Sequence, residues 1–211
     1  MNLPFLGGMR VTEAPSPNHD PRPEGAVVDS LILHYTGMES GRAALDRLRD
    51  PAATVSAHYL VEEDGEVFRL VPEARRARHA GVSSWRGREA LNATSIGVEV
   101  VNPGHDWGYR DFPALQMAAV AELCLDILAR HPAIPPRNVL AHSDVAPDRK
   151  QDPGERFPWK TLAQAGHGLW FEPAPERVAA LTGLLQPGDQ GLGVVVLRSG
   201  LHRFGYGLPP G

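Results

Sequence analysis

The chain has 211 residues, of which 42% are hydrophobic and 22% are charged, and its formal net charge is −4. This composition is typical of a folded domain and excludes a disordered chain, and the negative charge argues against nucleic-acid binding, which requires a basic surface. The length predicts one catalytic-sized domain with at most a small appendage. No run in the sequence reaches the roughly 18 apolar residues of a membrane span.

Two features of the sequence bear on the compartment. Cys124 is the only cysteine, which excludes a disulfide within the chain and a cysteine-rich zinc cluster. Residues 1–17 lack the charged segment and the apolar core of a secretory signal. We therefore expect a cytoplasmic protein, with the periplasm or cell envelope as the alternative if a leader has been removed.

Strands and helices alternate in the first half of the chain. X-Pro steps exclude a helix from the lead-in, because the residue before a proline disfavours the helical region. Asp64-Gly65 is a hairpin turn signal. The predicted elements are an extended lead-in over residues 12–25, a strand over 27–33 that ends at His34, a helix over 41–50, a hairpin of strands 59–61 and 67–70, and a strand over 95–101.

The clearest helix is predicted over residues 112–130, with Asp111 as the candidate N-cap. Its apolar residues recur at three- and four-residue steps and predict one stripe that faces the core. That stripe consists of Phe112, Leu115, Ala119, Leu123 and Ile127. A last strand over 139–141 ends at His142. This alternation predicts an α/β fold, with a mixed central β-sheet flanked by helices.

The composition changes after residue 170, where a Pro-containing linker leads to a short predicted helix over 176–185. We therefore divide the chain into a catalytic-sized domain over residues 1–170, a linker and short helix over 171–183, and a separate segment over 184–211. The last segment carries several apolar side chains. We expect it to pack on the domain, because a mobile segment would expose them to water.

Two of the nine histidines stand out because each follows an apolar strand: His34 follows LIL and His142 follows VLA. In open α/β sheets, ligands gather at strand ends. Asp152, in a loop ten residues after His142, completes a set of two histidines and one carboxylate. Three such ligands with an open water position are the pattern of a catalytic zinc site. The alternative is a pair of hydrogen-bonded histidines at the edge of the core, and spacing alone leaves it open.

Two further charged residues are candidates for chemistry. Lys150 stands two residues before Asp152, so in an extended loop both side chains point the same way, and a cation there could stabilise an oxyanion. The alternative is a solvated basic pair with Arg149. Glu99 lies in the middle of the strand SIGVEVV, where burial would raise the pKa of its carboxyl towards that of a general base. The alternative is an exposed glutamate at an edge.

Five stretches of the chain together identify a family. They are Leu33-His34-Tyr35-Thr36, SAHYLV (56–61), HAG (79–81), LNATSIGVEVVN (91–102) and LAHSDVAPDRKQDPGERFPW (140–159). This set strongly resembles the zinc-dependent N-acetylmuramoyl-L-alanine amidases of the amidase-2 class, which share a fold with the peptidoglycan recognition proteins. The resemblance covers roughly residues 14–170. It is closer to the AmiD type than to the AmpD type, which has an arginine where this chain has Ala90.

The resemblance implies that residues 1–170 form a zinc amidase catalytic domain that acts on peptidoglycan or muropeptides. We expect the protein to be a monomer. The reaction implied is hydrolysis of the amide between the lactyl group of N-acetylmuramic acid and L-alanine of the stem peptide. Zn²⁺ is the implied cofactor, since it polarises a carbonyl and activates water. By this resemblance the zinc ligands are His34, His142 and Asp152, the catalytic residues are Glu99 and Lys150, and the substrate-binding residues are Tyr59 and His79.

The C-terminal segment has a resemblance of its own. Residues 184–208 resemble the opening of a peptidoglycan-binding repeat, of which the second half is missing. The alternative function for the chain is a non-catalytic muropeptide-binding module, which should lack a metal ligand, the carboxylate or the lysine. All five positions hold competent residues here. A cell-wall endopeptidase on the same scaffold is a third interpretation, and analysis of the products would separate it.

Overall fold

Six strands form the central sheet in the order β1-β5-β4-β9-β3-β10. β4 and β5 pair antiparallel, as the hairpin prediction requires, and every other pair in this sheet is parallel. The computed structural model describes residues 10–179, 183 and 185–208. The strands are β1 (Val11–Glu13), β3 (Ser30–Tyr35), β4 (Tyr59–Val61), β5 (Val67–Arg69), β9 (Ser95–Val100) and β10 (Val139–Ala141). The predicted mixed α/β fold is therefore confirmed.

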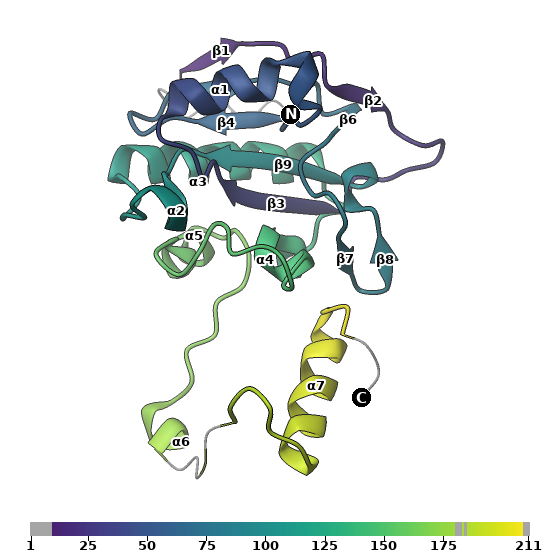
Figure 1. Cartoon of the computed structure of the whole chain (residues 1–211), viewed down its shortest axis with the longest axis vertical. Helices are drawn as coiled ribbons and strands as arrows, with labels where there is room; N and C mark the ends of the chain where they lie inside the picture. The colour runs from purple at the N-terminus through teal and green to yellow at the C-terminus, as the bar shows by residue number, and fades with distance from the viewer. Residues whose placement is uncertain (1–9, 180–182, 184, 209–211) are drawn as a thin grey trace.

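Helices cover both faces of this sheet (Figure 1). α3 packs on one face through residues such as Leu123 and Ile127, and α1 packs on the other through Leu45 and Leu48. The helices are α1 (Gly41–Arg49), α2 (Gly104–Trp107), α3 (Ala114–Arg130), α4 (His142–Val145), α5 (Trp159–Gln164), α6 (Pro175–Ala179) and α7 (Leu192–Phe204). None of the helices in the described part of the chain is long and apolar enough to cross a membrane.

Two short pairs of strands complete the architecture outside the central sheet. In the first pair, β2 (His19–Pro21) runs antiparallel to β6 (Arg75–Ala77). In the second, β7 (Ser84–Trp85) and β8 (Arg88–Glu89) form a hairpin. The lead-in is thus extended, as its prolines predict, and part of it is paired.

The long helix α3 starts later and packs differently than its sequence pattern predicts. It begins at Ala114 and has no side-chain cap; Asp111 instead accepts a hydrogen bond from the Arg156 guanidinium at 2.8 Å. Leu115 is 69% exposed rather than in the core. Steps of four residues advance by about 40° around a helix, so the residue that starts such a series lies at the edge of the stripe. The buried residues of α3 are Gln116, Ala119, Val120, Leu123, Cys124 and Ile127.

Four parallel neighbours, β4, β9, β3 and β10, bring their carboxyl ends to one edge of the sheet. β3 begins at Ser30 rather than at residue 27, since Val27 precedes the ladder and is 57% exposed. The register pairs His34 of β3 with Glu99 of β9, so both side chains point to the same face. β10 ends where α4 begins, and His142 is the first residue of that helix. The fold therefore gathers the candidate chemical groups at one edge.

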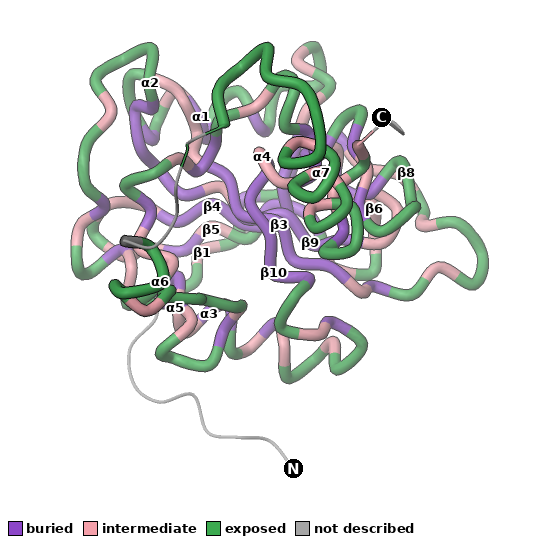
Figure 2. Tube along the Cα trace, turned by 90° about the horizontal axis from the view of Figure 1, so that it is seen from below, coloured by how far each residue is buried: buried purple, intermediate pink, exposed green. Residues whose placement is uncertain are grey.

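The C-terminal segment contacts the domain through its end and not through the length of its helix (Figures 1 and 2). The rings of Tyr206 and Trp85 lie 5.3 Å apart, and the hydroxyl of Tyr206 donates to Asp144 at 2.6 Å. Most apolar side chains of α7 remain exposed, contrary to expectation, with Leu192 at 78% and Val196 at 62%. Residues 180–182 and 184 of the predicted helix lie outside the described residues. The three segment boundaries stay a prediction.

Candidate metal centre

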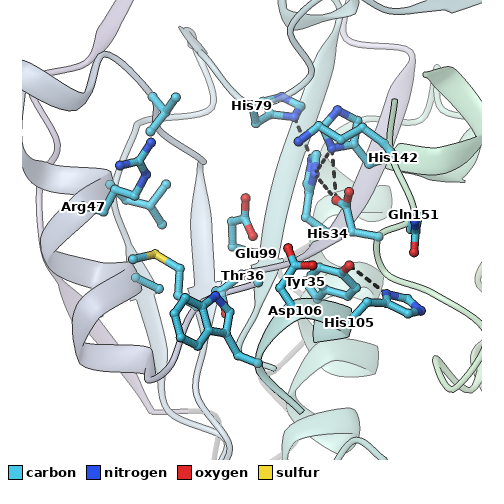
Figure 3. Close-up of a pocket in the computed structure, with 18 of the residues that line it drawn as sticks. His34, Tyr35, Thr36, Arg47, His79, Glu99, His105, Asp106, His142 and Gln151 are labelled. Carbon is cyan, nitrogen blue, oxygen red and sulfur yellow. Dashed lines mark hydrogen bonds and ion pairs between the residues drawn. The ribbon is translucent and has the colours of Figure 1, made fainter. Parts of the chain in front are cut away.

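Three side chains converge at the carboxyl edge of the sheet (Figure 3). His34 comes from β3, His142 from α4 and Asp152 from the loop after α4. Nδ1 of His34 lies 2.9 Å from Nδ1 of His142, and each of these nitrogens lies 3.0 Å from Oδ2 of Asp152. All three residues are buried. The structure therefore brings together the two histidines and the carboxylate that the sequence singles out.

The outer nitrogen of His142 determines which of its ring nitrogens carries the proton. Nε2 of His142 lies 3.1 Å from the carbonyl oxygen of Ala80. A carbonyl only accepts hydrogen bonds, so Nε2 carries the proton and Nδ1 of the neutral ring carries a lone pair. The loop that supplies Asp152 is held in place, because the backbone N–H of Ser143 donates to its carbonyl at 3.0 Å. Nδ1 of His142 therefore faces Asp152 as an acceptor.

A chain of hydrogen bonds determines the proton of His34 in the same way. The hydroxyl of Ser95 donates to the carbonyl of Leu91 at 2.6 Å, so its oxygen accepts from Nε2 of His79 at 3.2 Å. Nδ1 of His79 then carries the lone pair, and it accepts from Nε2 of His34 at 3.1 Å. Nδ1 of His34 is left as an acceptor. Like that of His142, it points at the carboxylate.

Two nitrogen lone pairs and a carboxylate oxygen thus face one another at 2.9–3.0 Å. Burial, and then the proximity of His142, lowers the pKa of His34 to about 4, so this imidazole is neutral at pH 7. Three electron-rich atoms at this distance repel one another unless a cation lies between them. Neutral imidazole nitrogens and a carboxylate are metal ligands, and a three-ligand set leaves a coordination position open. The donor set fits a divalent metal ion.

Glu99 lies beside this centre with its carboxylate turned towards the same cavity (Figure 3). Its Oε2 atom is buried and has no hydrogen-bond partner among the described residues. Burial, followed by the negative charge of Asp152, raises the pKa of Glu99 well above its ordinary value, and Lys150 partly opposes this. A carboxylate left without a partner beside a metal-type centre is suited to exchange a proton with a bound molecule.

The cavity has a volume of about 600 Å³ and is open to solvent. His34, His142 and Asp152 line it together with Glu99 and Lys150. Lys150 is half-buried, and its backbone N–H donates to the carbonyl of Ala146 at 3.0 Å. All five residues predicted to act in chemistry therefore share one cavity.

His79 also lines this cavity, yet its main contacts are with the residues around it. Its ring bridges Ser95 and His34, and it packs over Gly97 of β9. A Cβ atom at position 97 would overlap the His79 ring, so glycine is required there for space. His79 was expected on the substrate side; in this structure it sets the orientation of His34.

Tyr59 is not among the residues that line the cavity, and its role in binding substrate stays a prediction. Side chains alternate along β4, and Leu60 shares the face of its partner Glu99. Tyr59 therefore points to the opposite face, where it packs in the core beneath α3. Its hydroxyl donates to Glu73 at 2.7 Å.

Two residues that hold the loop over the metal centre were missed by sequence reasoning. Oδ1 of Asn92 accepts hydrogen bonds from the backbone N–H groups of His79 at 3.1 Å and of Ala80 at 2.7 Å. Arg149 is exposed, yet its guanidinium donates to the carbonyls of Ala80 at 2.6 Å and Val82 at 3.0 Å. The only signal for this in the sequence is that asparagine commonly satisfies backbone groups in turns.

The chain matches known proteins over most of its length. The sequence profile of the family described as N-acetylmuramoyl-L-alanine amidase matches residues 24–155. The chain is 40% identical over 192 residues to N-acetylmuramoyl-L-alanine amidase AmiD of Escherichia coli, covering 85% of this chain and 67% of AmiD. It is 39% identical over 173 residues to 1,6-anhydro-N-acetylmuramyl-L-alanine amidase AmpD of Escherichia coli, covering 74% and 90%.

Solved structures agree with these matches. The Escherichia coli AmiD structure, in complex with anhydro-N-acetylmuramic acid-L-Ala-D-γ-Glu-L-Lys, aligns with a TM-score of 0.73 and 38% identity, over 90% of this chain and 77% of AmiD. AmpDH3 of Pseudomonas aeruginosa, in complex with an anhydromuramic pentapeptide, aligns with a TM-score of 0.73 and 36% identity, over 90% and 78%. The chain therefore belongs to the N-acetylmuramoyl-L-alanine amidase family.

The hydrogen-bond chain to His34 predicts a measurable effect on metal binding. His79→Phe keeps a ring of similar shape but removes the acceptor for Nε2 of His34. We expect the affinity for a divalent metal to fall about 10- to 100-fold, the usual cost of removing an outer partner of a ligand. Competition with a chromophoric chelator measures this affinity.

The matched control is His105→Phe, since His105 lines the same cavity but its ring contacts Tyr35 and Glu155, at 2.9 and 3.1 Å, rather than a candidate ligand. Equal metal affinities for the two variants would show that His79 does not orient His34.

Proposed function

We propose that this protein is a zinc-dependent N-acetylmuramoyl-L-alanine amidase. It would hydrolyse the amide between the lactyl group of N-acetylmuramic acid and L-alanine of a stem peptide. The observation that carries this proposal is the convergence of two imidazole lone pairs and a carboxylate next to Glu99, whose buried Oε2 has no partner among the residues that the structure describes. Membership of the family, and the muropeptide ligands of the two related structures, support the choice of substrate.

His34, His142 and Asp152 would hold the metal, and two histidines with one carboxylate are a ligand set of catalytic zinc. When bound, zinc polarises the scissile carbonyl and lowers the pKa of water towards about 7. The protein's part is to keep both Nδ1 lone pairs aimed at one point. The carbonyl of Ala80 and the ring of His79 do this from outside.

Glu99 is the proposed general base. Its buried oxygen has no competing hydrogen bond among the described residues, so it is free to accept a proton from the attacking water. The protonated carboxyl then donates that proton to the nitrogen of the leaving L-alanine. A raised pKa suits both steps, because the group must accept a proton and later release it.

Lys150 is the proposed donor to the oxygen that becomes negative as water attacks the carbonyl. It lines the cavity in the same loop as Asp152, and its positive charge acts on Glu99 as well. A cation placed where charge develops stabilises the transition state more than the bound substrate. Lys150 would therefore raise turnover more than it improves binding.

Product identification tests the function directly. Incubation of the zinc-loaded protein with anhydro-N-acetylmuramic acid-L-Ala-D-γ-Glu-L-Lys should release a tripeptide that begins with free L-alanine, identified by mass. An endopeptidase would leave L-alanine on the sugar. A muropeptide that is bound but not cleaved would instead indicate the binding-only function.

Glu99→Gln in the same assay should lose about 10²- to 10⁴-fold in turnover, the typical contribution of a general base. The change is nearly isosteric, so the fold and the metal content should remain. Turnover within about threefold of the parent protein would show that another group moves the proton.

Lys150→Ala should change both the rate and its pH dependence. The loss of one oxyanion donor should lower kcat by about 10²- to 10³-fold. Glu99 must be ionised to act as a base, so the rate falls as the pH drops through its pKa. Lys150 lowers that pKa. Its removal should therefore shift the acid limb, which is the low-pH side of the plot of kcat/KM against pH, to higher pH. A rise in KM alone, with the acid limb unmoved, would mean that Lys150 only binds substrate.

A further inference from the structure

Three arginines line the cavity, and two of them are already engaged by the protein. The guanidinium of Arg78 donates to both carboxylate oxygens of Asp20 at 3.1 Å. Arg149 donates to backbone carbonyls of the loop over the metal centre. Arg47 remains.

Arg47 lies in the last turn of α1, on the side of the cavity opposite His34 and His142, with Glu99 between them (Figure 3). It is exposed, and its guanidinium has no hydrogen bond or ion pair with any described residue. On the same helix, Arg42 is paired with Asp46 at 2.7 Å. Of the cavity's arginines, Arg47 is thus the one whose guanidinium is free for a bound anion within the described chain.

The chemistry of the substrate shows where such an anion must come from. In the bond to be hydrolysed, the lactyl carboxyl is already consumed in the amide, so the sugar side carries no free carboxylate. The peptide side does carry one. In the ligand of the related AmiD structure, glutamate is linked through its γ-carboxyl, and this linkage leaves the α-carboxylate of that residue free.

The length of the peptide places this carboxylate away from the metal centre. An extended chain advances about 3.3–3.6 Å per residue, so the second residue of the stem lies about 7 Å beyond the scissile amide. The group that binds its carboxylate must therefore line the cavity at a distance from the ligands. Arg47, on the far wall, meets this requirement, and a guanidinium matches a carboxylate with two parallel hydrogen bonds.

We propose that Arg47 binds the α-carboxylate of the γ-linked D-glutamate in the stem peptide. The α1 side of the cavity then holds the peptide. Arg47 makes the enzyme prefer stems with a free glutamate over stems in which this carboxylate is amidated to isoglutamine. This inference rests on the proposed amidase function, because the substrate's orientation is set by the bond that is cleaved.

The test uses two muropeptides that differ only at this carboxylate: anhydro-N-acetylmuramic acid-L-Ala-D-γ-Glu-L-Lys and its D-isoglutamine counterpart. The zinc-loaded full chain should cleave the acid form with a higher kcat/KM. Arg47→Ala should lower kcat/KM for the acid form by about tenfold, mainly through KM, and leave the isoglutamine form unchanged. The preference of the parent protein should also weaken as salt is added, since an exposed ion pair is screened.

Arg42→Ala is the matched control, because it removes an arginine from the same helix and leaves the cavity lining intact. It should keep the parent's preference for the acid form. A basic residue at a helix end can also stabilise the fold by interacting with the helix dipole. The melting temperatures of both variants measure this effect on stability separately from substrate binding. Equal losses of Arg47→Ala on both muropeptides, or an unchanged preference, would overturn the proposal.

Binding to the Glu99→Gln protein, measured by calorimetry for both muropeptides with and without Arg47→Ala, judges the inference without turnover. Tighter binding of the acid form that disappears in Arg47→Ala supports it even if no cleavage is seen, in which case the proposed function alone has failed. Equal affinities for the two muropeptides would overturn the inference even if both are cleaved.

Discussion

The site depends on one constraint: two imidazole rings must present lone pairs, and not N–H groups, to the same carboxylate oxygen. Each ring is held in that state from outside. The carbonyl of Ala80 fixes His142, and the sequence of contacts from Ser95 through His79 fixes His34. The resulting cluster of electron-rich atoms is unfavourable by itself and becomes favourable around a cation. The contacts outside the cluster thus aim both rings at one point.

Much of the surrounding structure serves this arrangement. Glycine at position 97 leaves space for the His79 ring, and Asn92 and Arg149 hold the loop that carries Ala80. The parallel register of β3 and β9 places Glu99 beside His34. There its Oε2 atom is buried and has no hydrogen-bond partner in the described part of the chain. The same low-dielectric environment that lowers the pKa of His34 therefore raises the pKa of Glu99.

The sequence was sufficient to predict which residues meet in the cavity, but not the contacts that hold them there. His34 and His142 could be found because each follows an apolar strand, and the ends of parallel strands meet at one edge of the sheet. Glu99 could be found because it is a carboxylate in the middle of an apolar strand. The sequence did not predict to which face of the sheet the side chain of Tyr59 points. That face depends on the register of β4, because a shift of one residue moves every side chain to the opposite face, and the sequence pattern does not reveal the register. The role of His79 depends on Ser95 and on a backbone carbonyl, contacts between segments that no local pattern encodes. The prediction that Leu115 faces the core was wrong, because residues at four-residue steps rotate gradually around the helix.

The most direct test of the central claim is to locate the metal and its ligand atoms. Crystals of the zinc-loaded protein, measured on both sides of the zinc absorption edge, would show where the ion lies. The account predicts one zinc per chain, bound by Nδ1 of His34, Nδ1 of His142 and Oδ2 of Asp152, with Nε2 of each histidine still facing His79 and Ala80. Zinc bound through Nε2 of either ring, or found away from these three residues, would contradict it.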